Sequence, residues 1–346
     1  MSKQRVLLLG ATGETGGSIL EGLLEQSSQF DVELLVRPAS AEKASVKKLA
    51  DRVSALRIID INGPVEDLVA VLRGVDVVIS AIDALSFAAQ KNLATAAKQA
   101  GVKRFLPCMF ATIMPPGGIM ILRDSKEEII QHVRKLYLPY TFVDIGWWYQ
   151  ISFPTVPSGR LDYATNSPSK PLHGNGDGPL NLYTDRTDIG RFVARIIADP
   201  RTLNKYVVAW GEQLTEHDIW RITEEVTGEK ITARKYVPHE ETLARLHEAE
   251  AAVQAAGGVA AADGALLLGL STLQYENTMF VRGDNCLEYA KYLGYLDARE
   301  LFPDLRPKSF REFLEEVLAG KGVKPYQGDG ATAQIIKAAS GKAGKA

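Results

Sequence analysis

The first 145 residues alternate between short apolar runs and amphipathic segments, and this alternation constrains the fold more than any other feature. The apolar runs are continuous, which is typical of parallel strands that are buried on both faces. Each run is followed by a segment with helical spacing, so helices are expected to connect consecutive strands. The pattern predicts an α/β fold with a doubly wound parallel sheet of the Rossmann type, which binds ligands beyond the carboxyl ends of its strands.

The expected elements can be placed along the whole chain. In the first half the predicted strands are 6–9, 31–36, 57–60, 75–80, 104–108 and 141–145, and the predicted helices are 16–25, 43–49, 65–72, 88–100 and 124–136. In the second half we expect helices over 188–197, 216–227, 240–256 and 310–318, a strand over 205–208, and Thr215 as a helix N-cap. A Gly/Ala-rich break is expected from about residue 257 to Gly269.

The composition changes near residue 154, where a stretch rich in Pro, Gly, Ser and Asn begins. We therefore expect a Rossmann-type domain over 1–153, to which part of the second half returns. A smaller, mainly substrate-binding α/β domain is expected over 154–325. A low-complexity tail over 326–346 is expected to be disordered.

Charge and cysteine content exclude several functions. A net charge of −2 gives no basic surface for nucleic acid or for an anionic membrane. Two distant cysteines, Cys108 and Cys286, and five histidines argue against disulfides and a zinc site, so no metal is expected. The apolar run before the first glycines is too short for a signal peptide, and no stretch reaches membrane-spanning length. A cytoplasmic protein is expected, acting on a small molecule as a monomer or homodimer.

The loop after the first strand carries the pattern Gly10-x-x-Gly13-x-x-Gly16 and opens a helix. In a dinucleotide fingerprint, the first glycine permits a tight turn, the second lets the backbone approach the pyrophosphate, and the third allows close packing. The helix N-terminus adds unpaired N–H groups. A glycine-rich turn also occurs in folds that bind no nucleotide, so this alternative stays open. Within the loop, the predicted cofactor-binding residues are Gly10, Thr12, Gly13, Glu14, Thr15 and Gly16.

The end of the second strand indicates which dinucleotide would bind. Here Arg37 stands where NAD-binding domains usually carry an acid, and Lys43 follows. A guanidinium suits the 2′-phosphate of NADP through bidentate hydrogen bonds, whereas an ordinary surface arginine is the alternative. The small residues Ser80, Ala81 and Ile82 end another strand and would let the adenosine side approach, although packing explains them nearly as well.

Several segments together resemble one known family. They are GATGETGG, LLVRP, VDVVISAI, AGVKRFLPCMF, SKEEIIQHVRKLYLPYTFV, DIGRFVARIIADP and LFPDLRPKSFREFLEE. In the same order, they are similar to segments of isoflavone reductase-like proteins, which include pinoresinol–lariciresinol and phenylcoumaran benzylic ether reductases. This group belongs to the NmrA-like atypical short-chain dehydrogenases. The resemblance covers roughly residues 4 to 320 and implies a Rossmann domain, NADPH and a smaller substrate domain.

The resemblance also implies site residues. Lys126 matches the family's catalytic lysine, which acts as general acid or base beside the nicotinamide. Phe110 matches an aromatic residue near the nicotinamide and is predicted to contact the cofactor. Cys108 and Met109 stand where the plant enzymes have Ser and Glu, which puts a lignan-type substrate in doubt; Met109 is predicted to face the substrate.

Aromatic residues follow the strand over 141–145 and are predicted to shape a substrate site. Trp147, Trp148 and Tyr149 would lie at the carboxyl edge of the sheet and could stack on a flat aromatic molecule, with interdomain packing as the alternative. The sequence predicts an NADPH-dependent reductase of a small aromatic or polyketide-like metabolite. Two other functions stay open: an NmrA-like NADP sensor without turnover, and a non-redox biosynthetic enzyme that retains the cofactor.

Overall fold

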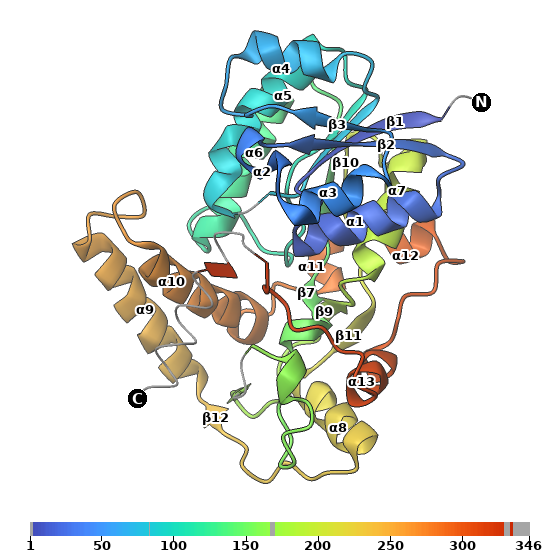
Figure 1. The fold of residues 1–346 in the computed structure, drawn as a ribbon. Helices are drawn as coiled ribbons and strands as arrows, with labels where there is room; N and C mark the ends of the chain where they lie inside the picture. The colour runs from blue at the N-terminus through green and yellow to red at the C-terminus, as the bar shows by residue number, and fades with distance from the viewer. Residues whose placement is uncertain (1–2, 83, 167–169, 329–332, 335–346) are drawn as a thin grey trace.

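The computed structural model describes residues 3–82, 84–166, 170–328 and 333–334. Its central feature is a parallel sheet in the upper half of Figure 1. Five strands pair in the order β3-β2-β1-β4-β5, and a second group pairs in the order β13-β10-β6. A parallel bridge between Phe105 and Tyr140 joins β5 to the start of β6. The strands are β1 (Gln4–Leu9), β2 (Phe30–Val36), β3 (Ala55–Ile58), β4 (Val77–Ser80), β5 (Arg104–Leu106), β6 (Thr141–Asp144), β10 (Lys205–Val208) and β13 (Leu296–Asp297).

Helices cover both faces of this sheet, so the predicted doubly wound α/β class is confirmed. One face packs against α1 (Glu14–Glu25), α3 (Ala44–Ala50) and α7 (Asp188–Ala198). The other face packs against α4 (Val65–Leu72), α5 (Gln90–Gln99) and α6 (Ile121–Lys135). Successive residues of β1 explain the two layers, since Val6 and Leu8 enter one core and Leu7 and Leu9 the other. Short helices α2 (Pro38–Ala41), α11 (Leu287–Tyr292) and α12 (Ala298–Leu301) flank these layers.

Residues from the second half of the chain complete this layer structure. Strands β10 and β13 extend the sheet beyond β6, and α7 packs closely on α1. Gly22 of α1 faces Gly190 of α7, where an added Cβ on Gly22 would lie 2.2 Å from the backbone of Gly190. The helices therefore approach each other at positions where only hydrogen atoms separate the two backbones.

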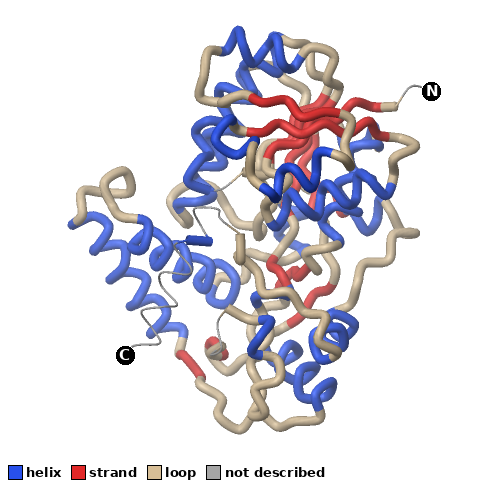
Figure 2. Tube along the Cα trace, viewed as in Figure 1, coloured by secondary structure: helices blue, strands red, loops and turns tan. Residues whose placement is uncertain are grey.

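The lower half of the molecule contains smaller sheets and helices (Figure 2). Strand β9 (Asn181–Thr184) pairs with β7 (Trp147–Trp148) and β11 (Glu212–Leu214), and β8 (Leu172–His173) pairs with β12 (Tyr236–Val237). Helices α8 (Glu216–Thr227) and α13 (Phe310–Leu318) enclose a separate apolar core with them. The prediction of Thr215 as N-cap is confirmed, because its hydroxyl accepts from the N–H of Asp218 in a capping box.

The expected break up to Gly269 is wrong. Helix α9 (His239–Ala255) is followed by a short turn, and α10 (Gly264–Glu276) already begins at Gly264. Asp263 caps α10 by accepting from the N–H of Leu266 at 2.8 Å. The leucines of α10 then pack against α9, so the cap and the packing offset the poor helix propensity of the two glycines.

Two further observations complete the fold. Among the helices that are described, none combines the length and apolar character needed to cross a membrane. The predicted disordered tail falls mostly outside the described residues, apart from 326–328 and 333–334.

Candidate active site

The glycine loop joins β1 to α1 in a geometry that requires glycine at two positions. Gly10 has φ +92°, and a Cβ there would lie 2.3 Å from the carbonyl oxygen of Ala81. A Cβ on Gly16 would lie 2.1 Å from the carbonyl oxygen of Gly10. Gly13 is the N-cap of α1 and supplies no side-chain acceptor. The loop is therefore a cradle of bare backbone, with the N–H groups of the first helical turn beside it.

A cavity of about 1140 Å³ begins at this loop and extends to the lower half of the molecule. This volume lies just above the roughly 300–1,000 Å³ that is typical of a site for one drug-sized ligand. The structure brings most of the predicted site residues together in its wall. These are Gly10, Thr12, Gly13, Glu14, Thr15, Arg37, Lys43, Ala81, Ile82, Phe110, Lys126, Trp147 and Trp148.

Four predicted residues lie outside the cavity wall. Gly16 packs beneath the loop, and the fully buried Ser80 hydroxyl has no hydrogen-bond partner within the described residues. Met109 is buried in the core under α5 and α6, so the expectation that its side chain faces the substrate is wrong. Its carbonyl oxygen is nevertheless part of the site, because it accepts a hydrogen bond from Lys126.

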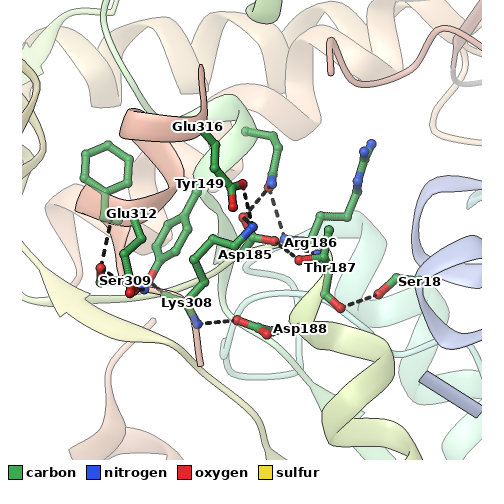
Figure 3. Close-up of polar contacts among 12 residues, drawn as sticks. Ser18, Tyr149, Asp185, Arg186, Thr187, Asp188, Lys308, Ser309, Glu312 and Glu316 are labelled. Atoms are coloured by element: carbon green, nitrogen blue, oxygen red, sulfur yellow. Dashed lines mark hydrogen bonds and ion pairs between the residues drawn. The ribbon is translucent and has the colours of Figure 1, made fainter. Parts of the chain in front are cut away.

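Tyr149 is also wrongly predicted to face the substrate. Its ring is completely buried and packs against Phe310 and Phe313 of α13, with centroids 5.3 and 5.8 Å away. Its hydroxyl donates to the carbonyl oxygen of Lys308 at 3.3 Å, as Figure 3 shows. The short turn after β7 rotates Tyr149 away from the two tryptophans and into the lower core.

Lys126 is a buried basic residue in the cavity wall. It lies on α6, one turn from Arg123 and Ile129 on the buried face of that helix. Its Nζ donates to the carbonyl oxygens of Cys108, at 2.9 Å, and Met109, and lies 4.8 Å from the centroid of the Phe87 ring. Burial lowers the pKa of the Lys126 ammonium, which makes its proton easier to lose.

A buried ion pair fixes the start of α6. Arg123 donates to Asp144 at 3.0 Å and pairs with Glu127. The hydroxyl of Tyr295 donates to the same Asp144 carboxylate at 2.5 Å. Asp144 ends β6 and is fully buried, and its negative charge helps to raise the pKa of Arg123 although burial opposes this. The network ties the helix that carries Lys126 to the carboxyl edge of the sheet.

Several residues of the site were not predicted from the sequence. Arg186 forms an ion pair with Glu14, and Glu14 also accepts from the N–H of Tyr326 at 2.7 Å. The Tyr326 ring stacks on Trp148 with centroids 5.7 Å apart. Residues near 326 thus form part of the cavity wall.

Figure 3 shows how the chain around Arg186 is held. Asp185 accepts hydrogen bonds from the N–H and hydroxyl of Thr187, and the carbonyl oxygen of Thr187 accepts from Ser18 of α1 at 3.2 Å. Asp188 accepts from the N–H of Lys308 at 2.6 Å. These contacts join α7 to α1 and to the segment before α13, so the position of Arg186 depends on both halves of the chain.

A second unpredicted group comes from α10 and β8. Tyr275 packs against Trp147 with ring centroids 4.7 Å apart, and both line the cavity. His173, Glu216 and Glu276 also line it. No sequence signal marked these residues: the expected break covered only the first half of α10, no element was predicted over Tyr275 and Glu276, and the histidines showed no metal or triad spacing. Within the described residues, no group of three or more His, Cys, Asp or Glu side chains is placed to hold a metal ion.

The parallel sheet and its glycine cradle define the chain as a Rossmann-type α/β protein. A family model described as NmrA-like matches residues 2–314, and the chain belongs to this family. The NmrA-like membership expected from the sequence motifs is therefore confirmed.

Relatives of known name match almost the whole chain. The chain is 40% identical over 318 residues to the asnovolin J 5′,6′-dehydrogenase nvfM of Aspergillus novofumigatus. This alignment covers 91% of this chain and 95% of that protein. It is 28% identical over 327 residues to the phenylcoumaran benzylic ether reductase Pyrc5 of Pyrus communis, covering 91% of this chain and 99% of that protein.

Solved structures agree with the fold. The leucoanthocyanidin reductase of Vitis vinifera, solved as a binary complex with NADPH, superposes with a TM-score of 0.74 at 22% identity, covering 91% of this chain and 99% of that one. AtPrR2, solved with NADP⁺ and (+)-pinoresinol, gives a TM-score of 0.72 at 24% identity, covering 92% of this chain and 99% of that one.

Proposed function

We propose that this chain is an NADPH-dependent reductase of a small aromatic or polyketide-like molecule. The observation that carries the proposal is a buried lysine amine in the same cavity as a bare glycine cradle. A dehydrogenase and a benzylic ether reductase among the relatives, and neighbours solved with NADPH or NADP⁺, support the reaction class and the cofactor.

The residues present fit an NADP dinucleotide. The cradle at Gly10 and Gly16 leaves no side chain between the backbone and a pyrophosphate, and the uncapped N–H groups of α1 would hold it. Arg37 follows β2 directly and lines the cavity, where its guanidinium would hold a 2′-phosphate. Glu14 would repel a phosphate, but its ion pair with Arg186 offsets this charge. When bound, the nicotinamide supplies a hydride.

In this proposal Lys126 moves the proton that accompanies reduction. Two of its N–H groups are held by the carbonyl oxygens of Cys108 and Met109, which fixes the position of Nζ. As an ammonium it has a third N–H to donate, and as a neutral amine it has a lone pair that can accept a proton. Burial favours the neutral amine, so exchange with a substrate oxygen near neutral pH costs less than for an exposed lysine. Trp147, Trp148 and Tyr275 exclude water and provide faces for an aromatic substrate.

The test is NADPH consumption with a panel of ketones, enones and benzylic ethers. The wild type is expected to oxidise NADPH with a panel member, whereas Lys126→Met is expected to lose about 100-fold or more in kcat and still bind NADPH. Lys135→Met is the matched control, because Lys135 is exposed on the last turn of the same helix. Full activity of Lys126→Met would contradict the proton-transfer role. Tight NADPH binding without consumption by any panel member would favour an NADP sensor, and a product unchanged in hydrogen content would favour a non-redox enzyme.

A further inference from the structure

A buried histidine and two glutamates form a polar cluster in the cavity wall that the proposed reduction does not use. His173 lies on β8, Glu216 begins α8, and Glu276 ends α10. The Nδ1 of His173 lies 2.9 Å from one oxygen of Glu216, and the backbone N–H of His173 donates to the other at 2.7 Å. The imidazole also stacks on Phe280, with centroids 4.5 Å apart and planes 9° from parallel. The ring is therefore held in one orientation, with Nε2 on the side away from Glu216.

Two atoms of this cluster have no hydrogen-bond partner among the described residues. They are Nε2 of His173 and Oε2 of Glu276, and both are buried. The two atoms lie 3.6 Å apart, which is too long for a good hydrogen bond. Arg245 approaches the same Glu276 oxygen only to 3.8 Å. The two atoms form a long ion pair, but neither has a hydrogen bond to a described residue. Because buried polar atoms without hydrogen bonds are costly, this pair in a cavity wall favours an occupant that supplies both bonds.

The charges of the cluster determine which hydrogen-bonding groups a ligand needs in order to bind there. Burial lowers the pKa of His173, but the hydrogen bond to Glu216 and the negative charges of Glu216 and Glu276 outweigh it and raise the pKa to about 9. The imidazolium then presents an Nε2–H donor, and the Glu276 carboxylate beside it is an acceptor only. The nearby Lys170 is also a cavity residue, and burial lowers its pKa to about 8 although Glu276 opposes this.

A hydroxyl matches this pair of atoms because it accepts one hydrogen bond and donates another. A ketone, ester or ether would satisfy the histidine and leave the carboxylate unpaired, and an ammonium would do the reverse. A carboxylate has no hydrogen to donate to Glu276. The aromatic rings of Phe280, Trp220 and Tyr275 also line the cavity, which favours a hydroxyl attached to an aromatic ring over an aliphatic one.

We propose that His173 and Glu276 form a phenol-binding subsite that accepts the substrate hydroxyl between Nε2 and Oε2. This deepens the proposed function and rests on it for the view that the cavity takes an aromatic substrate. The subsite is a recognition site: Lys126, on α6, handles the reacting oxygen, and His173, on β8, selects molecules that carry a further hydroxyl.

The experiment compares phenols with their methyl ethers. Binding of 2-naphthol, 4-phenylphenol and 7-hydroxyflavone, and of the methyl ether of each, is measured by calorimetry with the NADP⁺-saturated protein. In at least one pair the phenol is expected to bind about 10- to 100-fold more tightly, because the ether leaves Glu276 without a hydrogen bond. Equal affinities in every pair, or no binding by any phenol, would overturn the proposal and leave the cluster as a site for ordered water. An aliphatic pair, cyclohexylmethanol and its methyl ether, tests the preference for an aromatic ring.

Variants link the preference to the two residues. His173→Phe keeps the stacking on Phe280 but removes the donor, and Glu276→Met removes the acceptor. Each is expected to reduce the phenol preference to about twofold or less, whereas Glu248→Met, on the exposed face of α9, should keep it. Unchanged preference in both folded variants would refute the assignment. These binding measurements need no turnover. If Lys126→Met keeps full activity, the proposed proton transfer fails but the subsite does not; if the phenol preference is absent, the subsite fails but the proposed reduction does not.

Discussion

The contact between α1 and α7 offers a direct test of how closely the two halves of the chain are joined. Replacing Gly190 by Ala would place a Cβ 1.7 Å from the carbonyl oxygen of Ser18. Real Cβ contacts essentially never fall below 3.0 Å, so the two helices would have to separate by about 1.3 Å. The N–H of Gly190 also donates to the Ser18 hydroxyl at 2.9 Å, and this buried bond would be weakened.

The magnitude follows from these two effects. Overpacking costs about 1–3 kcal/mol, and the loss of one buried hydrogen bond adds about 1 kcal/mol. Gly190→Ala is therefore expected to lower the free energy of unfolding by about 2–4 kcal/mol, although alanine is the better helix former. In a chain of this size the midpoint of thermal unfolding should fall by about 3–6 °C.

The assay is urea and thermal unfolding followed by circular dichroism. Gly17→Ala is the matched control on α1, because its added Cβ would meet its nearest neighbour at 3.5 Å, an ordinary contact. The control should be neutral or stabilise by up to about 1 kcal/mol. If Gly190→Ala were as stable as the wild type, the close approach of the two helices would be refuted.

Two further predictions concern the cofactor and pH. Arg37→Ala is expected to weaken NADPH binding about 10- to 100-fold and to change NADH binding little. Arg52→Ala is the surface control, because it breaks only the exposed ion pair with Glu21. Equal losses of affinity for both cofactors in a calorimetric titration would refute the 2′-phosphate role. The pKa of His173 is raised from 6.5 to about 9, so its stabilising contribution of about 3 kcal/mol should be present below pH 6.5 and disappear as the pH rises through 9. Urea unfolding from pH 6 to 10 should show the stability gap between wild type and His173→Phe closing over this range, and a constant gap would contradict the assigned pKa.

The sequence was sufficient to predict the layered part of the fold and the glycine cradle, because both rest on local patterns. Continuous apolar strands and helical spacing are properties of neighbouring residues, and Gly10 and Gly16 act within one turn. The position of Lys126 was inferred from a family resemblance rather than from its own pattern. It lies in the same cavity as the cradle because β6 and α6 bring it there.

The rest of the site depends on contacts between distant residues, which local patterns do not encode. Tyr149 followed two tryptophans and was expected to share their surroundings, but residues of α13 provide a core that buries it instead. The start of helix α10 was missed because its glycines predict a break, whereas its leucines form an apolar face that packs against α9. His173 and Glu276 are about a hundred residues apart, so only the folded chain brings them together.

The hydrogen bond between Tyr326 and Glu14 has a consequence for biosynthesis. The two residues are separated by 312 positions, so Glu14 leaves the ribosome long before Tyr326 does. The cavity wall at Trp148 is therefore completed only after Tyr326 has been synthesised. A nascent chain that stalls before residue 326 would hold a formed glycine loop beside an unfinished wall. Replacing Tyr326 and its neighbours by an unrelated linker would produce the same unfinished wall in the released protein.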